Sequence, residues 1–257
     1  MTSKAPKLGA FIHSTALFVY LMRGGISVRY FGGKSRICKD IATILNENRG
    51  EGQIFLSPFV GGGWVEQYIK GPKVLVDKHK YLISMYLELQ KGWLPPTTIS
   101  KEEYLHIKDN PNEVPHLTGF VGFGCSHSGK WFGGYAKDNT ERNYCLNAHN
   151  SLMKKVDNGL LKGSKFICSD YRDLNPRDYL IYCDPPSKGT TQYDREVVGY
   201  FDHNEFWKIM REWSQHNKVF ISEYNAPEDF KLVWEKSTKL DMKSNRSQDR
   251  VERLFTL

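Results

Sequence analysis

An Asp-Pro-Pro sequence, Asp184-Pro185-Pro186, follows an apolar run at residues 179–183 that predicts a buried β-strand. Ligands of open α/β sheets bind at the carboxyl ends of the strands. The two prolines fix the backbone and remove two N–H donors, so the carboxylate and nearby carbonyls form a rigid cluster of hydrogen-bond acceptors. Such a cluster suits an exocyclic amine, which has two hydrogens to donate. A plain turn is the alternative interpretation of this tripeptide taken alone.

A glycine-rich segment, Phe59-Val60-Gly61-Gly62-Gly63, lies between a predicted strand at residues 54–56 and a predicted short helix. Glycines at that place let the backbone approach a ligand at the amino end of a helix. Glu66 stands where the G-x-G-x-x-G fingerprint has its third glycine, which disfavours a dinucleotide dehydrogenase. Asp77 ends the next predicted strand, where a carboxylate can accept hydrogen bonds from ribose hydroxyls. The two features suggest a nucleoside-type ligand, with a tight turn and a surface Asp as the alternative.

Other familiar sites are disfavoured by spacing. Gly32-Gly33-Lys34-Ser35 is no phosphate loop, because Val28 occupies the position of the required first glycine; Lys34 can still face a carboxylate or a phosphate. His127 lies near Cys125 without a third ligand at metal spacing, so no metal is expected. The five cysteines are an odd number without a C-x-x-C pair, which favours reduced thiols in a cytosolic protein over a disulfide framework. The sequence has no G-x-S-x-G nucleophile elbow, which disfavours a serine hydrolase.

Alternating strands and helices must position these residues. Short apolar runs predict strands at residues 54–56, 74–76, 166–168, 179–183, 218–222 and 253–255. Helical periodicity separates them, with Ser35 expected to cap one helix and Asp202 another. This order predicts a mostly parallel sheet covered on both faces. Residues 93–164 interrupt the alternation, and several prolines punctuate that stretch.

Composition is that of a globular protein. Of the 257 residues, 40% are hydrophobic and 25% charged, which excludes wholesale disorder, collagen and coiled coil. The net charge of +7 favours a polyanionic partner only weakly. Residues 10–22 resemble the apolar region of a signal peptide but are short for a membrane span and lack a clear A-x-A cleavage site. We expect an added helix or an upstream start there instead.

The order of the motifs YFGGKSRI, FVGGG, VLVDKHK, CSDY and YCDPP resembles the Dam-type (D12 class) family of DNA adenine N6-methyltransferases, most closely its phage- and prophage-encoded members. The resemblance covers roughly residues 29–257. It implies an α/β, Rossmann-like S-adenosylmethionine-dependent core with an inserted, mostly helical DNA-recognition domain. The expected division is an N-terminal extension at 1–28, a catalytic core at 29–95 and 165–257, and the insertion at 96–164.

The resemblance also assigns roles to residues. The methyl donor would be S-adenosylmethionine, with no metal required. Lys34 would lie near the amino-acid portion of the donor, Asp77 would hold its ribose hydroxyls, and Asp170 and Tyr171 would flank its adenine. The remaining donor-site residues by similarity are Tyr30, Gly33, Phe59, Gly61 and Gly63. The catalytic tetrapeptide would be Asp184, Pro185, Pro186 and Ser187.

Ser187 departs from the family pattern, in which the tetrapeptide ends in an aromatic residue. Stacking of such a ring on the extruded adenine is worth about 1–3 kcal/mol per base, and a serine cannot replace it. Three explanations stay open: a natural variant with weak activity, a binding-only relative, or an altered enzyme. Tyr171 or Tyr193 is a candidate for a substitute ring.

The insertion combines basic and aromatic side chains. Residues 120–165 hold seven basic and three acidic residues together with six aromatics, which suits phosphate contact and base insertion. The expected DNA-binding residues are Lys130, Trp131, Lys137, Arg142, Lys154 and Lys155. A solvated face over a small core is the alternative. We therefore expect a cytoplasmic, monomeric protein that acts on double-stranded DNA and does not associate with membranes. Two further functions stay open: a non-catalytic DNA-binding protein with donor affinity, and a methyltransferase for protein or small-molecule amines.

Overall fold

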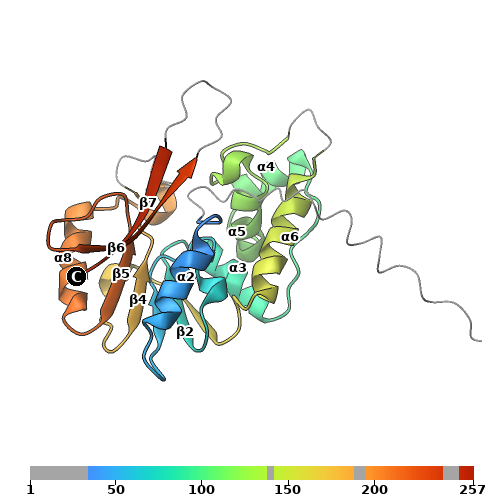
Figure 1. Ribbon diagram of the computed structural model, residues 1–257. Coiled ribbons are helices and arrows are strands. Elements are labelled where there is room, and N and C mark those ends of the chain that lie inside the picture. Colours follow the sequence, from blue (N-terminus) through green and yellow to red (C-terminus); the bar gives the residue numbers. More distant parts are fainter. Residues whose placement is uncertain (1–33, 138–141, 188–194, 240–248) are drawn as a thin grey trace, which may run out of the picture.

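A single mixed sheet organises the chain in the computed structural model, which describes residues 34–137, 142–187, 195–239 and 249–257 (Figure 1). Its strands are β1 (Phe55–Ser57), β2 (Lys73–Asp77), β3 (Ser164–Cys168), β4 (Leu180–Cys183), β5 (Lys218–Ser222), β6 (Lys231–Lys239) and β7 (Asp249–Thr256). The strand order is β3-β2-β1-β4-β5-β7-β6. Strands β1 to β5 pair in parallel, whereas β7 runs antiparallel to both β5 and β6. The 3-2-1-4-5 order of the parallel strands is that of a Rossmann-like sheet.

Each of the six predicted strands is present, and the prediction of an α/β, mostly parallel sheet is confirmed. Strand β7 is longer than the expected 253–255, because it forms a hairpin with β6. Sequence reasoning missed β6, whose first residues, Lys231, Leu232 and Val233, are exposed at the edge of the sheet. An edge strand lacks the buried apolar run by which the central strands are recognised.

Helices cover both faces of the sheet. They are α2 (Cys38–Glu47), α3 (Lys80–Gln90), α4 (Lys101–Asp109), α5 (Pro115–Gly124), α6 (Tyr144–Asp157), α7 (Arg195–Val198) and α8 (His203–Ser214), with 3₁₀ turns η2 (Glu66–Tyr68), η3 (His127–Gly129) and η4 (Tyr171–Asp173). Alternate residues of the central strands point to opposite faces, so both faces are apolar. In β1, for example, Phe55 belongs to one core cluster and Leu56 to the other.

Two of the expected helix caps have different outcomes. The Asp202 carboxylate accepts hydrogen bonds from the backbone N–H groups of Asn204 and Glu205, so it caps α8 as predicted. The prediction that Ser35 caps a helix is wrong, because α2 has Ile37 at its N-cap and no side-chain cap. At the start of α2 the Lys34 carbonyl instead accepts hydrogen bonds from the N–H groups of Ile37 and Cys38.

The segment between β2 and β3 is helical and packs onto the sheet. Helices α4, α5 and α6 gather beside α3, while α8 lies across the sheet from them (Figure 1). One core cluster continues from Phe55 of β1 through α3 to Phe120 of α5 and Leu152 of α6. The inserted helices therefore share a hydrophobic core with one face of the sheet. Within the described ranges, no helix has the length and apolar character needed to cross a membrane.

Candidate active site

The sheet changes direction between β1 and β4. From β1 the chain adds β2 and β3 on one side, and from β4 it adds β5 on the other, so neighbouring strands β1 and β4 form the topological switch point. A crevice opens at the carboxyl ends of such strands and is the usual ligand site. The residues that follow β1 are Pro58 to Gly63, which we call the glycine loop, and those that follow β4 are Asp184 to Ser187. The fold thus brings together the two motifs that the sequence analysis singled out.

Side chains of β2 and α3 hold the backbone of the glycine loop. The Gly61 N–H donates to Asp77 Oδ2 at 2.9 Å, and the Tyr86 hydroxyl of α3 donates to the Gly61 carbonyl at 2.7 Å. Gly63 has a φ of +64°, and a Cβ there would lie 2.8 Å from Cδ1 of Leu160. Glycine at position 63 is therefore required both by the left-handed backbone and by a close neighbour.

Asp77 braces this loop from the end of β2. Its Oδ1 accepts the His79 N–H at 2.9 Å, and its Oδ2 accepts the Gly61 N–H. Burial raises the pKa of Asp77 above its usual range and outweighs the opposing effect of these hydrogen bonds. A carboxylate has about four lone-pair sites, so Asp77 retains capacity to accept ribose hydroxyls as well.

Asp184 belongs to a cluster of three charged side chains. Lys34 Nζ lies 3.2 Å from Asp184 Oδ1 and 2.9 Å from Glu252 Oε2 of β7. Lys34 is only 9% exposed. Burial lowers the pKa of Lys34, but the carboxylates of Asp184 and Glu252 outweigh that effect, so the net pKa is raised. The lysine that the sequence placed near the donor thus contacts the catalytic candidate directly.

An aromatic cluster lies beside the glycine loop on the face covered by α8. The ring of Phe59 is 5.0 Å from that of Tyr171 and 5.9 Å from that of Phe201. Tyr171 is 6% exposed and also packs against Phe206. Its ring is therefore part of the core, where it contacts Phe59.

Asp170 is held by two cations at the end of β3. Its carboxylate accepts hydrogen bonds from the Arg172 guanidinium, and its Oδ2 lies 2.8 Å from Lys78 Nζ. The Arg172 hydrogen bonds, reinforced by Lys78, keep the pKa of Asp170 well below its usual range. Asp170 also accepts the Arg172 N–H and so caps η4.

Part of the sequence that forms this edge of the sheet matches a known family model. Residues 30–116 match the family model of the D12 class N6 adenine-specific DNA methyltransferases. The matched methyltransferase segment contains Lys34, the glycine loop and Asp77, whereas Asp184 and Glu252 lie beyond it. No curated protein matches the sequence.

Solved structures with a similar arrangement of elements include methyltransferases. An rRNA methyltransferase from Streptomyces viridochromogenes superposes with a TM-score of 0.40 at 11% identity, over 90% of this chain and 90% of that chain. The tRNA (m1A58) methyltransferase from Aquifex aeolicus gives a TM-score of 0.36 at 10% identity, over 85% of this chain and 66% of that one. Similarity at this level carries no argument about function.

The six residues expected to bind DNA fall into different environments. The side chains of Lys130, Lys137, Arg142 and Lys154 are exposed. Trp131 is half-buried, because it stacks on Tyr81 and contacts His79, with ring centroids 5.6 Å and 4.2 Å away respectively.

Lys155 does not fit the expected phosphate contact. It is 6% exposed, and its Nζ donates to the Gly62 carbonyl at 2.6 Å, inside the molecule. Helical periodicity places Lys154 outward and Lys155 inward on α6, so only Lys154 can meet a phosphate at the surface. The expectation for Lys155 is corrected accordingly.

Several site residues were missed from the sequence. Tyr86 and Glu252 contact the predicted residues from α3 and β7, and Glu66 lies buried behind the loop with Oε1 2.8 Å from Ser57 Oγ. A period-two pattern was the available signal for Glu252, because it lies two residues before buried Leu254 in a terminal strand. Nothing in the sequence distinguishes Glu66 from an exposed carboxylate at the start of a helix.

Some predictions lie outside the described residues. These are the donor-site residues Tyr30 and Gly33, the candidate ring Tyr193, and the proposed extension at 1–28. Among the described side chains, no group of three or more His, Cys, Asp or Glu has the arrangement needed to hold a metal ion.

Proposed function

We propose that this chain transfers a methyl group from S-adenosylmethionine to the N6 amino group of adenine in DNA. The observation that carries the proposal is the position of the glycine loop beside Asp184-Pro185-Pro186 at the switch point between β1 and β4. A nucleoside-type donor and an amine acceptor would thus meet at one crevice. The match of residues 30–116 to D12 class adenine methyltransferases supports both substrates.

The residues at the crevice fit such a donor. A ribose suits the Asp77 carboxylate, and a purine ring suits the aromatic surface of Phe59. The glycine loop offers a backbone without a side chain at Gly61, which is partly exposed, so a ligand can come close there. When bound, S-adenosylmethionine supplies an electrophilic methyl group on a sulfonium sulfur.

Asp184 and Pro185 would orient the accepting nitrogen. The amino lone pair of adenine is delocalised into the ring, so the nitrogen is a poor nucleophile. Hydrogen bonds from its two hydrogens to the Asp184 carboxylate and the Pro185 carbonyl favour a more tetrahedral nitrogen and direct its lone pair along the line of transfer. The nitrogen bonds the methyl carbon as the carbon–sulfur bond breaks, and the cationic nitrogen then releases a proton.

Lys34 and Glu252 would keep this carboxylate in position. The Lys34 ammonium bridges Asp184 and Glu252, which fixes Asp184 with respect to both α2 and β7. Asp184 retains a 28% exposed side chain, so an extruded base can reach it. Exposed Lys130, Lys137, Arg142 and Lys154 would contact the DNA backbone. With DNA as substrate, we propose a cytoplasmic protein that acts as a monomer.

A second candidate function is a DNA- and donor-binding protein with weak or no transferase activity. Ser187 supplies no ring to stack on the base, and the packing of Tyr171 against Phe59 and Phe206 removes it as a substitute. This observation favours slow transfer by the natural sequence. It leaves the donor site and the DNA-binding surface unaffected.

Transfer of labelled methyl from S-adenosylmethionine to unmethylated DNA tests the proposal. We expect detectable incorporation by the wild-type chain and about a tenfold to hundredfold higher rate for Ser187→Tyr, since a stacked ring is worth about 1–3 kcal/mol. The Ser187→Ala variant is the matched control and should stay near the wild-type rate.

The outcomes separate the candidate functions. Incorporation only by Ser187→Tyr would establish an intact scaffold and favour the binding role for the natural chain. Silence from both folded proteins would overturn the transferase proposal. Incorporation into protein or small-molecule amines that DNA does not inhibit would instead favour a different substrate class.

A further inference from the structure

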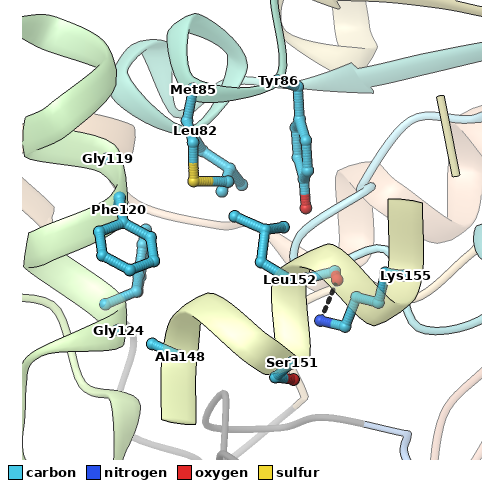
Figure 2. A pocket seen from close by; sticks show the side chains of 12 residues that line it. Leu82, Met85, Tyr86, Gly119, Phe120, Gly124, Ala148, Ser151, Leu152 and Lys155 are labelled. Carbon is cyan, nitrogen blue, oxygen red and sulfur yellow. Dashed lines mark hydrogen bonds between the residues drawn. The ribbon is translucent and has the colours of Figure 1, made fainter. Parts of the chain in front are cut away.

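Lys155 is a buried amine with a defined set of neighbours. Its Nζ donates a hydrogen bond to the Gly62 carbonyl at 2.6 Å (dashed line in Figure 2). The same atom lies 3.9 Å from the centroid of the Trp64 ring. Burial lowers the pKa of Lys155 to about 7, against the opposing influence of Glu66 and Cys38. Burying an amine is unfavourable unless it is hydrogen-bonded, so its position here is set by the Gly62 carbonyl and the indole face.

The residues that follow Lys155 also contact the glycine loop and the elements next to it, η2 and β2. Asn158 Nδ2 donates to Gln67 Oε1 at 2.7 Å, and Lys73 Nζ donates to the Gly159 carbonyl at 2.8 Å. Leu160 closes on Gly63, where an added Cβ would lie 2.8 Å from its Cδ1. The end of α6 is therefore fastened to the glycine loop and to η2 over several successive residues.

A small apolar cavity lies next to this connection. Its volume is about 60 Å³, and it is bounded by α3, α5, α6 and Gly62 (Figure 2). Leu82, Phe120, Ala148 and Leu152 line it, and Lys155 lies at its edge. The cavity is too small for a nucleoside. It does give a longer side chain at position 155 room to adjust.

We infer that Lys155 is a positioning residue that holds the Gly62 carbonyl, so that helix α6 of the insertion sets the shape of the glycine loop and thereby the affinity for the methyl donor. The inference rests on the proposed function, because it takes the glycine loop as the donor site. A single substitution at Lys155 can remove this hydrogen bond and leave the glycines of the loop unchanged. Its neighbour Lys154 faces outward from the same helix, so α6 would contact the DNA on its exposed side and the donor-binding loop on its buried side.

Direct binding of S-adenosylhomocysteine by titration calorimetry tests this inference. Lys155→Met keeps an unbranched side chain, one atom shorter, and removes the donor, and we expect its Kd to rise about tenfold, as for loss of a hydrogen bond from a charged group. Lys155→Arg keeps a donor and should bind within about threefold of wild type. Leu152→Ala is the matched control: it loosens the same helix one turn away, lowers the thermal stability and should leave the Kd unchanged.

Steady-state kinetics add a readout that loss of stability would not produce. We expect Lys155→Met to raise KM for S-adenosylmethionine with kcat nearly unchanged, because Lys155 does not touch the reacting atoms. An unchanged Kd in Lys155→Met overturns the inference, as does equal weakening in Leu152→Ala. Failure of the wild-type chain to bind S-adenosylhomocysteine would instead overturn the proposed function itself.

Discussion

The glycine loop and the Asp184–Ser187 segment lie side by side, yet different forces shape them. The loop is held by side chains from elsewhere: Asp77 of β2, Tyr86 of α3 and Lys155 of α6. The second segment is stiffened by its own proline rings, and Lys34 anchors its carboxylate. The glycine loop, on the proposed donor side, thus depends on side chains from three distant elements, whereas the backbone of the Asp184–Ser187 segment depends on its own prolines and only its carboxylate on a distant lysine. Changes to the two segments should therefore affect different observables.

Removal of the Asp184 carboxylate should give the largest effect. We expect Asp184→Ala to lower the rate of methyl transfer by about 10³-fold, since loss of one preorganised electrostatic partner costs 10² to 10³ in other enzymes. Binding of S-adenosylhomocysteine should change little, because no contact of the glycine loop is lost. Single-turnover assays and calorimetry on the same protein measure both quantities. A Kd that rises in parallel with the loss of rate would contradict the division between the two segments.

A methyl group added to the glycine loop should give the opposite result. Gly63→Ala combines a φ of +64° with a Cβ 2.8 Å from Leu160, so the loop must shift. We expect donor affinity to fall about tenfold and the free energy of unfolding to fall by about 1–3 kcal/mol. Urea denaturation and calorimetry provide the two values.

Gly52→Ala is the matched control for that variant. Its φ of +69° imposes similar strain, but nothing lies within 4 Å of the added Cβ, and the residue precedes β1, whereas the loop follows that strand. It should lose about 1 kcal/mol of stability and keep its donor affinity. If both glycine variants bind S-adenosylhomocysteine equally well, the contact with Leu160 does not shape the donor site.

The smallest expected effect concerns the buried carboxyl behind the loop. Burial raises the pKa of Glu66 from 4.5 to about 7. The folded protein then binds this proton more tightly than the unfolded chain, so wild-type stability falls as the pH rises from 4.5 through 7. The Gln side chain of Glu66→Gln cannot ionise, so the stability of this variant should not fall over that pH range. Between pH 5 and pH 8 the variant should therefore gain about 2 kcal/mol of unfolding free energy relative to wild type. Parallel pH profiles from urea denaturation would refute the assignment.

The central strands were predictable because they are short, fully apolar and buried on both faces, as in the run Leu180 to Cys183. Their carboxyl ends also located the glycine loop, Asp77 and Asp184. The edge strand β6 was not predictable, because exposed residues such as Leu232 and Lys231 follow no strict alternation. The pairing of Glu252 with Lys34 was equally hidden, since a local pattern can indicate the face on which a residue lies but not the distant residue that it contacts.

Lys155 shows where charge misled the interpretation of a sound pattern. The buried positions of α6 are Cys145, Ala148, Leu152 and Lys155, a helical spacing of three, four and three residues. Periodicity therefore indicated an inward side chain at position 155. The basic, aromatic composition of the segment favoured DNA contact instead, because lysines are seldom fully buried.

The Lys34–Glu252 contact joins residues 218 positions apart. Such a contact forms only after the chain between them has collapsed around the sheet, and it contributes heavily to the contact order of the fold. During synthesis, Lys34 and Asp184 leave the ribosome well before β7 does, so the charged cluster is completed at the last stage of folding. A nascent or C-terminally clipped chain would then carry the glycine loop and the Asp-Pro-Pro segment without the strand that anchors Lys34. For the proposed methyl transfer, the anchoring of Asp184 through Lys34 and Glu252 would thus depend on completion of β7.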